Sequence, residues 1–442
     1  MADAARLAAY DVLRAVRVDD AYANLALVQV LRDHGLTGRD AGFATELAAG
    51  TLRGLGLYDA VIDACLDRGK VRPRVRDVLR LGAHQLLAMR VPAHAAVSAT
   101  VDLARARTGA HSGSLVNAVL RRVAERDLDE WVARVAPDPA EDPLGRLAVA
   151  HSHPRWVVAE LERALGERFD ELPALLAADN DPPEVVLVAR PGRSERSELP
   201  GEPTALSPYG VRLGAGDPRT IPAVAEGRAG VQDEGSQLVA VALASARLEG
   251  RDERWLDLCA GPGGKAALLA ALAAQGGARL VANEVQPHRA DLVRRALSGA
   301  EGVEEVTVHD GRRPSWDAGS FDRVLVDAPC SGLGALRRRP EARWRRQHSD
   351  LADLVPLQRD LLASALDLVR PGGVVLFATC SPVIAETAEV VEHVLAARTA
   401  ELEPVALGVP DATGPVPGTI QLWPHRHATD AMFMAQLRRS AA

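Results

Sequence analysis

Apolar residues recur three and four positions apart through the first third of the chain, which is the spacing of one face of an amphipathic helix. From Ala4 to about Glu130 this helical pattern holds throughout, and no convincing strand interrupts it. Four short breaks separate the predicted helices, at residues 35–38, 69–73, 91–93 and 108–113. We therefore predict an all-α domain over residues 1–135.

The pattern changes after a segment rich in Pro and Asp, residues 136–143, which is typical of a linker. Helical spacing returns over residues 156–169 and 172–179, and it gives way to a short strand pattern over Glu184–Ala189. A region rich in Pro and Gly follows this strand. These features predict a small connecting α+β domain over residues 145–230.

From Arg254 onward, short apolar segments alternate with helical ones, which is typical of a parallel, doubly wound sheet. The predicted strands are Trp255–Leu258, Leu280–Asn283, Val306–Val308, Val324–Val326, Val374–Ala378 and Phe433–Gln436. We predict a C-terminal α/β Rossmann-like domain over residues 231–442. Because ligands bind at the carboxyl ends of such strands, the polar residues found there become the candidates for chemistry.

The overall composition is that of a globular, multidomain protein, since 442 residues exceed one ordinary core and 47% of them are hydrophobic. The first 18 residues form an amphipathic helix pattern, not a charged and then apolar secretion signal. No apolar run approaches the roughly 18 residues of a membrane span. Four cysteines without a paired spacing favour a reducing compartment. We therefore expect a cytoplasmic protein that does not contact membranes.

The net charge of -7 conceals two clusters of cations. The first consists of Arg68, Lys70, Arg72, Arg74 and Arg76, and the second of Arg337, Arg338, Arg339, Arg343, Arg345 and Arg346. A phosphate backbone responds to local clusters and not to the charge of the whole chain. Each cluster is equally well explained as a solvated helix face or loop, so the pattern alone leaves both interpretations open.

The first strand of the predicted sheet leads into the glycine-rich segment DLCAGPGGK, residues 257–265. Glycines allow a backbone to approach a ligand closely, but no Ser or Thr follows Lys265 as a phosphate loop requires. Glu284 ends the second strand, where a carboxylate suits a ribose diol, and Asp310 follows the third, where it suits an adenine amino group. Together these features favour S-adenosylmethionine over NAD or ATP.

Two cysteines follow neighbouring strands, Cys330 after the fourth and Cys380 after the fifth, and each precedes a Ser. A single cysteine is usually a small buried hydrophobe, which is how we interpret Cys65, but two at adjacent strand ends favour a nucleophile. Carbon 5 of cytosine accepts a methyl group only after a thiolate has added to carbon 6, and Asp327 is placed to assist at nitrogen 3. This pattern does not say which cysteine attacks.

These segments resemble a known family. DLCAGPGGK (257–265), DAPCSGLG (327–334) and ATCSP (378–382) resemble motifs of the Sun-type RNA cytosine-5 methyltransferases, and so do VQDEGSQLVA (231–240) and RRRPEARWRR (337–346). SLVNAVLRR (114–122) lies in a helical domain that resembles the NusB RNA-binding domain. The combination, over nearly the whole chain, is similar to the bacterial ribosomal RNA small subunit methyltransferase B family.

The resemblance implies a role for each candidate residue. It implies that Cys380 is the nucleophile and that Cys330 aids product release, with Asp327 beside the target base. It implies cofactor contacts from Cys259, Ala260, Gly261, Pro262, Gly263, Gly264, Lys265, Glu284, Asp310 and Asp327, and no metal. The expected substrate is RNA, with ribosomal RNA of the small subunit as the first candidate. We expect a monomer acting on naked RNA.

The chain departs from the usual pattern of this family at three positions. Gly261 stands where Ala is expected, Glu284 where Asp is common, and Ala431 where a Gly usually follows the acidic residue. The first two changes preserve the chemistry that the cofactor site needs. The third lies at the end of the site that would receive the target base.

Three other functions remain to be weighed. A non-catalytic NusB-like RNA-binding or antitermination protein would leave the glycine-rich loop and both cysteines unexplained. A DNA cytosine methyltransferase, in which the cysteines exchange roles, needs a large target-recognition region, and the chain after Cys330 has no room for one. Transfer RNA remains an alternative substrate, since arginine clusters bind any phosphate backbone.

Overall fold

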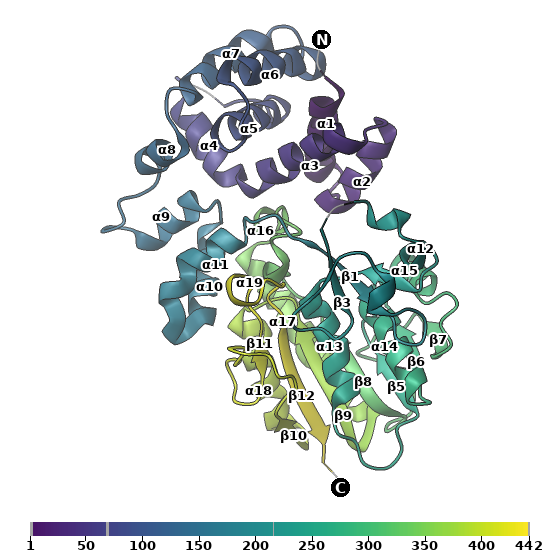
Figure 1. Ribbon diagram of the computed structural model, residues 1–442. Helices are drawn as coiled ribbons and strands as arrows, with labels where there is room; N and C mark the ends of the chain where they lie inside the picture. The colour runs from purple at the N-terminus through teal and green to yellow at the C-terminus, as the bar shows by residue number, and fades with distance from the viewer. Residues whose placement is uncertain (1–2, 68–69, 215, 441–442) are drawn as a thin grey trace. The chain divides into compact units, whose positions relative to one another are not determined.

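The computed structural model describes residues 3–67, 70–214 and 216–440, and it divides into two compact units (Figure 1). The helical unit comprises Met1–Pro182 together with Leu336–Arg346. The sheet unit comprises Pro183–Ala335 and Gln347–Ala442. The three-domain boundaries suggested by the sequence, at residues 135, 145 and 231, stay a prediction.

The first 182 residues form helices and no strand within the described part of the unit, so the predicted all-α N-terminal domain is confirmed. The helices are α1 (Ala4–Val18), α2 (Ala23–Asp33), α3 (Gly38–Arg53), α4 (Leu55–Ala64), α5 (Pro73–Leu87), α6 (Ala93–Thr108), α7 (Ser112–Val123), α8 (Leu128–Val135), α9 (Pro143–Ala150), α10 (Arg155–Leu165) and α11 (Leu172–Ala178). Side chains set several helix starts. Asp3 accepts a hydrogen bond from the Arg6 amide, and Asp127 and Glu130 form a capping box on α8.

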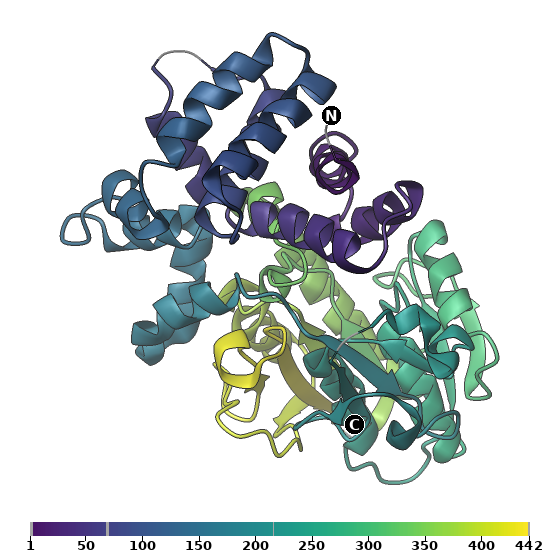
Figure 2. The same ribbon diagram turned by 45° about the horizontal axis from the view of Figure 1, so that its top comes forward.

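Helix α5 is the centre of this unit, since it packs against α1, α3, α4, α6 and α7. Its buried face carries Val75, Val78 and Leu79, the three-and-four spacing that the sequence shows. Gly82 lies beside them, where a Cβ would overlap the side chain of Leu120 on α7. This close approach lets α6 and α7 lie side by side against α5 (Figure 1; Figure 2).

The second arginine cluster lies in the segment that returns to the helical unit, Leu336–Arg346, which includes α16 (Ala342–Arg345). Arg343 is fully buried there and donates to the carbonyls of Ser152 and Asp179 and to Oδ1 of Asn180, over 2.7–3.2 Å. Burial lowers its pKa to about 10. The interpretation of Arg343 as a phosphate contact is therefore wrong, because its guanidinium already donates hydrogen bonds to acceptors inside the helical unit.

The first arginine cluster is more exposed. Arg76 pairs with Asp59 and Asp63, whereas Lys70, Arg72 and Arg74 are exposed on the helical unit. Arg68 lies outside the described residues. Three cations of this cluster are thus open to solvent and to a phosphate backbone.

The sheet unit begins with a small antiparallel sheet of order β2-β3-β1-β4. Its strands are β1 (Val185–Ala189), β2 (Glu202–Pro203), β3 (Gly210–Leu213) and β4 (Ala229–Val231). After β4, Asp233 caps α13 (Glu234–Ser245) by accepting from the amides of Gly235 and Ser236. The strand predicted over 184–189 is β1, whereas α10 and α11, which the predicted connecting domain includes, belong to the helical unit. The connecting α+β domain therefore stays a prediction.

The main sheet has the order β10-β12-β9-β8-β5-β6-β7, with β11 paired to β12. Its strands are β5 (Arg254–Asp257), β6 (Arg279–Asn283), β7 (Val303–Thr307), β8 (Phe321–Asp327), β9 (Val369–Thr379), β10 (Ala400–Glu403), β11 (Ile420–Gln421) and β12 (Phe433–Arg439). Strands β5 to β9 pair in parallel, as the alternating pattern predicts. The Rossmann-like α/β fold class is therefore confirmed.

The last predicted strand differs in direction. Strand β12 runs antiparallel to both β9 and β10, so a wholly parallel sheet is wrong. The segment between β10 and β12 contains only the short β11 and α19 (Pro424–His427), and it reverses the chain without a crossover helix of ordinary length. The sequence pattern of β12 marks a buried strand but does not give its direction.

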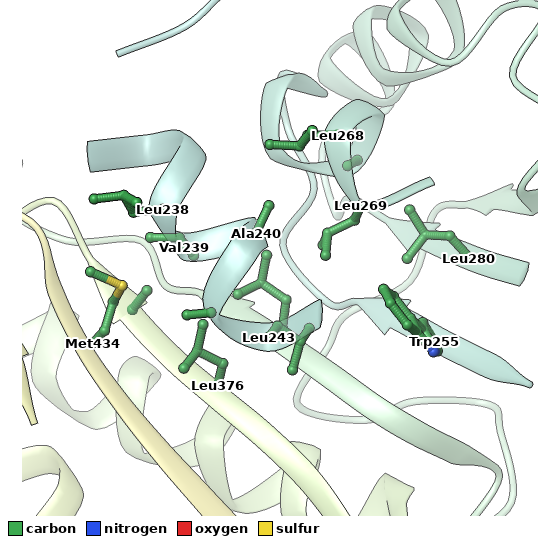
Figure 3. Packing of buried hydrophobic residues seen from close by; sticks show 14 of the residues in the cluster. Leu238, Val239, Ala240, Leu243, Trp255, Leu268, Leu269, Leu280, Leu376 and Met434 are labelled. Carbon is green, nitrogen blue, oxygen red and sulfur yellow. The ribbon is translucent and has the colours of Figure 1, made fainter. Parts of the chain in front are cut away.

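Helices cover both faces of the main sheet. Helices α13 and α14 (Gly264–Gln275) share one apolar cluster with Trp255 (Figure 3). Val293 of α15 (Pro287–Ala296) belongs to the same cluster. Helices α17 (Leu351–Leu368) and α18 (Ala388–Ala397) share the other with Leu256. Neighbouring residues of one strand thus pack against opposite helical layers. Within the described ranges, no helix is long and apolar enough to cross a membrane.

We expect Arg343→Ala to lower the free energy of unfolding by about 3 kcal/mol, because it leaves three buried acceptors without their donor and opens a cavity. Chemical denaturation of the full chain, followed by far-ultraviolet circular dichroism, measures this loss. The exposed Arg39→Ala in the same unit is the control and should change stability by less than about 0.5 kcal/mol. Equal effects of both changes would contradict a structural role for Arg343.

Candidate active site

The glycine-rich loop connects β5 to α14 at the carboxyl edge of the main sheet. Gly263 has φ +109°, in the left-handed region, and a Cβ there would lie 2.7 Å from that of Ala296. The Ala260 amide donates to the Asn283 carbonyl over 2.8 Å, which ties the loop to the end of β6. The loop is therefore held close to the neighbouring strand end, where a cofactor of a doubly wound sheet binds.

Two departures from the family pattern meet at one point in this loop. A Cβ on Gly261 would overlap Oε2 of Glu284, the residue that follows β6. Arg289 fixes the pair from the other side, because it donates to the Gly261 carbonyl and lies 3.4 Å from the Glu284 carboxylate. The missing methyl group at 261 thus provides the space for the longer acid at 284. The two departures compensate each other sterically.

Asn283, at the end of β6, is a residue whose role the sequence did not reveal. Its amide nitrogen donates to the carbonyls of Leu258 and His309, and its oxygen accepts from the His309 amide. The side chain is 1% exposed. It therefore joins the ends of three strands, β5, β6 and β7, and only the position of a buried amide at a strand end could have suggested this.

Asp310 follows β7, as predicted, and its carboxylate pairs with Arg312, with a shortest distance of 2.7 Å. Hydrogen bonds from Arg312 lower its pKa. Asp310 therefore stays a predicted adenine contact, and Arg312 is its partner here.

Lys265 and Asp327 form an ion pair across the site, with Nζ 2.8 Å from Oδ2. Lys265 lies in the first turn of α14 and Asp327 ends β8. Burial lowers the pKa of Lys265, but the Asp327 carboxylate raises it, and the net shift is upward. Lys265 therefore carries its proton beside Asp327 at neutral pH.

The two cysteines meet at the ends of β8 and β9. The sulfur atoms of Cys330 and Cys380 lie 3.5 Å apart, and both side chains are half-buried. Contact with Cys380 raises the pKa of Cys330 well above its usual value, and burial raises it further. A pair of thiols at this distance can divide two roles, since the sulfur that keeps its proton favours the thiolate on its neighbour.

The remaining cysteines lie elsewhere. Cys259 belongs to the glycine-rich loop, and burial raises the pKa of its thiol well above the ordinary value. Cys65 is buried in the helical unit, as predicted. Burial raises its pKa to about 11, so it is a poor nucleophile.

Known proteins resemble this chain over nearly its whole length. Residues 246–438 match the family described as 16S rRNA methyltransferase RsmB/F, and residues 3–125 match the NusB family. A Mycobacterium tuberculosis protein described as a methyltransferase is 53% identical, over 99% of this chain and 97% of its own. Ribosomal RNA small subunit methyltransferase B of Pseudomonas putida is 34% identical over 99% of both chains. The chain belongs to the RsmB/F methyltransferase family.

The crystal structure of PH0851 has the same fold, with a TM-score of 0.80, 24% sequence identity and coverage of 98% of both chains. Membership in the RsmB/F family confirms the resemblance that the motifs predict, and S-adenosylmethionine as the cofactor. The NusB match likewise confirms the NusB-like helical domain.

A buried carboxylate of this RsmB/F chain, Glu386, also went unnoticed in the sequence. It is 0% exposed and accepts hydrogen bonds from Ser331 and Ser381, each of which directly follows a cysteine. A lone Glu six residues after Cys380 carries no distinctive local signal.

Ala431, the third departure from the family pattern, packs against the loop that follows Cys330. Its amide donates to the Gly334 carbonyl over 2.8 Å, and a Cβ on Gly334 would overlap the Ala431 carbonyl. Ala431 is 2% exposed, so the methyl group that distinguishes this chain from the family pattern is packed inside. The close approach depends on glycine at 334 and not at 431.

Asp257, the last residue of β5, is 0% exposed, and its Oδ2 has no hydrogen-bond partner among the described residues. Burial, and then the Asp327 carboxylate, raise its pKa from 3.8 to about 8. Between about pH 4 and pH 8 the unfolded chain loses this proton and the folded chain keeps it. Stability therefore falls as pH rises through this range.

Asp257→Asn replaces the protonated acid with a neutral side chain of the same shape. We expect the melting temperature of the variant, relative to the parent, to rise between pH 5 and pH 8, because only the parent loses stability, by at most about 1.4 kcal/mol per pH unit. Differential scanning calorimetry at several pH values measures this difference. A difference that stays constant with pH would contradict the raised pKa.

Proposed function

We propose that this protein transfers a methyl group from S-adenosylmethionine to carbon 5 of a cytosine in RNA, through a covalent bond between Cys380 and carbon 6. The observation that carries the proposal is the pair of thiols 3.5 Å apart, at the strand ends beside the Lys265–Asp327 ion pair. A methyltransferase acting on oxygen or on an exposed amine needs no thiol, whereas cytosine carbon 5 does.

The residues around the glycine-rich loop fit an adenosyl cofactor. Gly261 and Gly263 leave the backbone bare of side chains, and Asp257 Oδ2 is a buried polar atom without a hydrogen-bond partner among the described residues. Glu284 would accept from the ribose hydroxyls and Asp310 from the adenine amino group. When bound, S-adenosylmethionine supplies the electrophilic methyl group.

The first covalent step uses Cys380 as the nucleophile. Its thiolate forms a bond to carbon 6, and the electron pair of the 5,6 double bond becomes a double bond between carbons 4 and 5. The electron pair of the double bond between carbon 4 and nitrogen 3 moves to nitrogen 3, which takes up a proton. We assign that proton to the Lys265–Asp327 pair, because Nζ of Lys265 donates a proton to Oδ2 of Asp327 over 2.8 Å. Carbon 5 thereby becomes nucleophilic enough to accept the methyl group.

Release needs a base for the proton on carbon 5. Once Cys380 is bound to carbon 6, Cys330 no longer faces a thiolate, which removes the main cause of its raised pKa. After its own proton has passed to solvent, Cys330 takes the carbon 5 proton. The 5,6 double bond then re-forms, the bond to Cys380 breaks, and the proton on nitrogen 3 returns to the ion pair.

The family relationship supports RNA as the substrate, and the Pseudomonas putida relative supports small-subunit ribosomal RNA in particular. The NusB-like helical unit presents Lys70, Arg72 and Arg74 to solvent, where they can contact phosphates without reading sequence. The target cytosine would have to be unpaired or turned out of its helix to reach two half-buried thiols.

Methyl transfer from labelled S-adenosylmethionine to small-subunit ribosomal RNA tests the proposal. We expect Cys380→Ala to lose activity by at least about 1,000-fold and to form no protein–RNA adduct, since it lacks the attacking sulfur. Cys330→Ala should instead accumulate the adduct, seen as a band that migrates slowly on denaturing gels.

Cys65→Ala, in the helical unit, is the matched control and should methylate normally. Activity that survives in Cys380→Ala would refute this assignment, and an adduct in Cys380→Ala but not in Cys330→Ala would exchange the two roles. Transfer RNA as a parallel substrate decides between the two RNA classes.

The steric match between positions 261 and 284 predicts a rescue. Gly261→Ala alone should weaken S-adenosylmethionine binding by about tenfold, because the new methyl group displaces the Glu284 carboxylate by more than a hydrogen bond tolerates. Glu284→Asp in the same chain removes one methylene and should restore most of the affinity. Isothermal titration calorimetry measures the dissociation constant of S-adenosylmethionine for each variant. If the two substitutions weaken binding additively in the double variant, the steric match is contradicted.

A further inference from the structure

Glu386 lies in a short turn between β9 and α18, and its carboxylate accepts four hydrogen bonds. Oε1 accepts from the Ser331 amide at 2.7 Å and from Nε2 of Gln358 at 3.0 Å. Oε2 accepts from the hydroxyls of Ser331 and Ser381, at 2.5 and 2.6 Å. The side chain is 0% exposed, so these donors replace the water that a buried charge loses.

The four donors favour a carboxylate at position 386 over an amide. Four donors converge on the two oxygens of this side chain, and a carboxylate can accept from all of them. The two serine oxygens lie 3.0 Å apart, and because each hydroxyl has one proton, both can point it at Oε2. A glutamine at 386 would place an amide N–H against one of these donors.

Each of these donors either follows a cysteine in the sequence or also bonds to the residue before one. Ser331 directly follows Cys330, and Ser381 directly follows Cys380. Gln358, on α17, also donates to the carbonyl of Pro329, the residue before Cys330, over 2.8 Å. One carboxylate therefore fixes the backbone on both sides of Cys330 and the residue after Cys380.

The two loops are also joined on the cysteine side. The Gly334 amide, four residues after Cys330, donates to the Cys380 carbonyl over 2.9 Å. This bond limits how far the loops can separate, but it does not hold Ser331 or Ser381. The Ala328 amide, two residues before Cys330, also donates to the Ala378 carbonyl over 2.9 Å. The strand ends are therefore held as neighbours by the sheet, and the Glu386 hydrogen bonds hold the residues that directly follow the two cysteines.

We propose that Glu386 is a positioning residue that holds the Cys330 and Cys380 sulfur atoms at contact distance, so that one can attack the base while the other serves its release. The geometric part of this proposal stands on the hydrogen bonds alone. Its consequence for catalysis rests on the proposed function. Glu386 contacts neither sulfur atom. It positions the two loops through Ser331, Ser381 and Gln358, and its charge is a further cause of the raised pKa of Cys330.

The rate at which the two thiols form a disulfide reports their relative position without RNA or S-adenosylmethionine. Diamide, an azo compound, oxidises two thiols to a disulfide and is itself reduced to the hydrazine, taking up the two electrons and two protons. The full chain is treated with diamide, quenched with an alkylating agent, and the Cys330–Cys380 peptide is quantified by mass spectrometry. The Cys330→Ala variant cannot form this disulfide, so its signal gives the background of the measurement.

We expect Glu386→Gln to slow formation of this disulfide at least about tenfold, since the loops lose the geometry that gives the thiols a high effective concentration. Glu234→Gln is the matched control. Glu234 is also buried in the sheet unit and accepts from the amides of Leu206 and Ser207, both at 2.6 Å, far from either cysteine loop in sequence. It should leave the rate unchanged.

An unchanged rate in folded Glu386→Gln overturns the proposal, as does an equal slowing in Glu234→Gln, which would indicate loss of stability alone. If Glu386→Gln does not fold, as judged by its thermal transition, Ser381→Ala replaces it and should slow the disulfide about threefold by removing one donor. An unchanged rate in folded Ser381→Ala then overturns the proposal.

Catalysis is measured separately on the same proteins. Glu386→Gln should lower kcat for methyl transfer at least about tenfold and leave KM for RNA within about twofold, because binding does not use the carboxylate. A raised KM with unchanged kcat would overturn the catalytic part. If the parent chain transfers no methyl group to any cytosine, the proposed function fails, and the disulfide rates still decide the geometric part.

Discussion

Strands β5 to β9 run parallel between two layers of helices, and burial on both faces is the constraint on which the rest of this protein depends. Burial forces neighbouring residues of one strand to opposite helical layers, as Trp255 and Leu256 show, and this fixes the register of the sheet. A fixed register brings the carboxyl ends of all five strands to one edge. The cofactor loop, the ion pair and both cysteines follow those ends directly.

Charged groups at this edge are costly to bury, and the structure compensates each in a different way. Lys265 and Asp327 neutralise each other, while Glu386 is surrounded by four donors. The second carboxyl oxygen of Asp257 has neither an ion-pair partner nor a hydrogen-bond donor among the described residues, and the pKa of Asp257 rises to about 8. Such unequal environments for neighbouring acids are typical of sites that move protons.

Arginine in this chain serves structure as well as charge. Arg343 is buried against carbonyls of the helical unit, and Arg289 holds the Gly261 carbonyl beside Glu284. In both cases one guanidinium joins backbone segments that the sequence keeps far apart. A count of cations therefore overstates the surface that is available to phosphates. In the first cluster, the exposed cations are Lys70, Arg72 and Arg74.

The sequence by itself determined the all-α and α/β regions, the positions of β1, β5 to β9 and β12, and the order in which loop, acids and cysteines follow them. It could do so because helix and strand burial have local periods, and because parallel strands share one edge. Only the tertiary structure decided the direction of β12, the burial of Arg343, the match between Gly261 and Glu284, and the place of Glu386. Each of these depends on which distant segments become neighbours. The hydrogen-bond partners of a buried polar group are set by the tertiary fold and not by the adjoining residues of the chain.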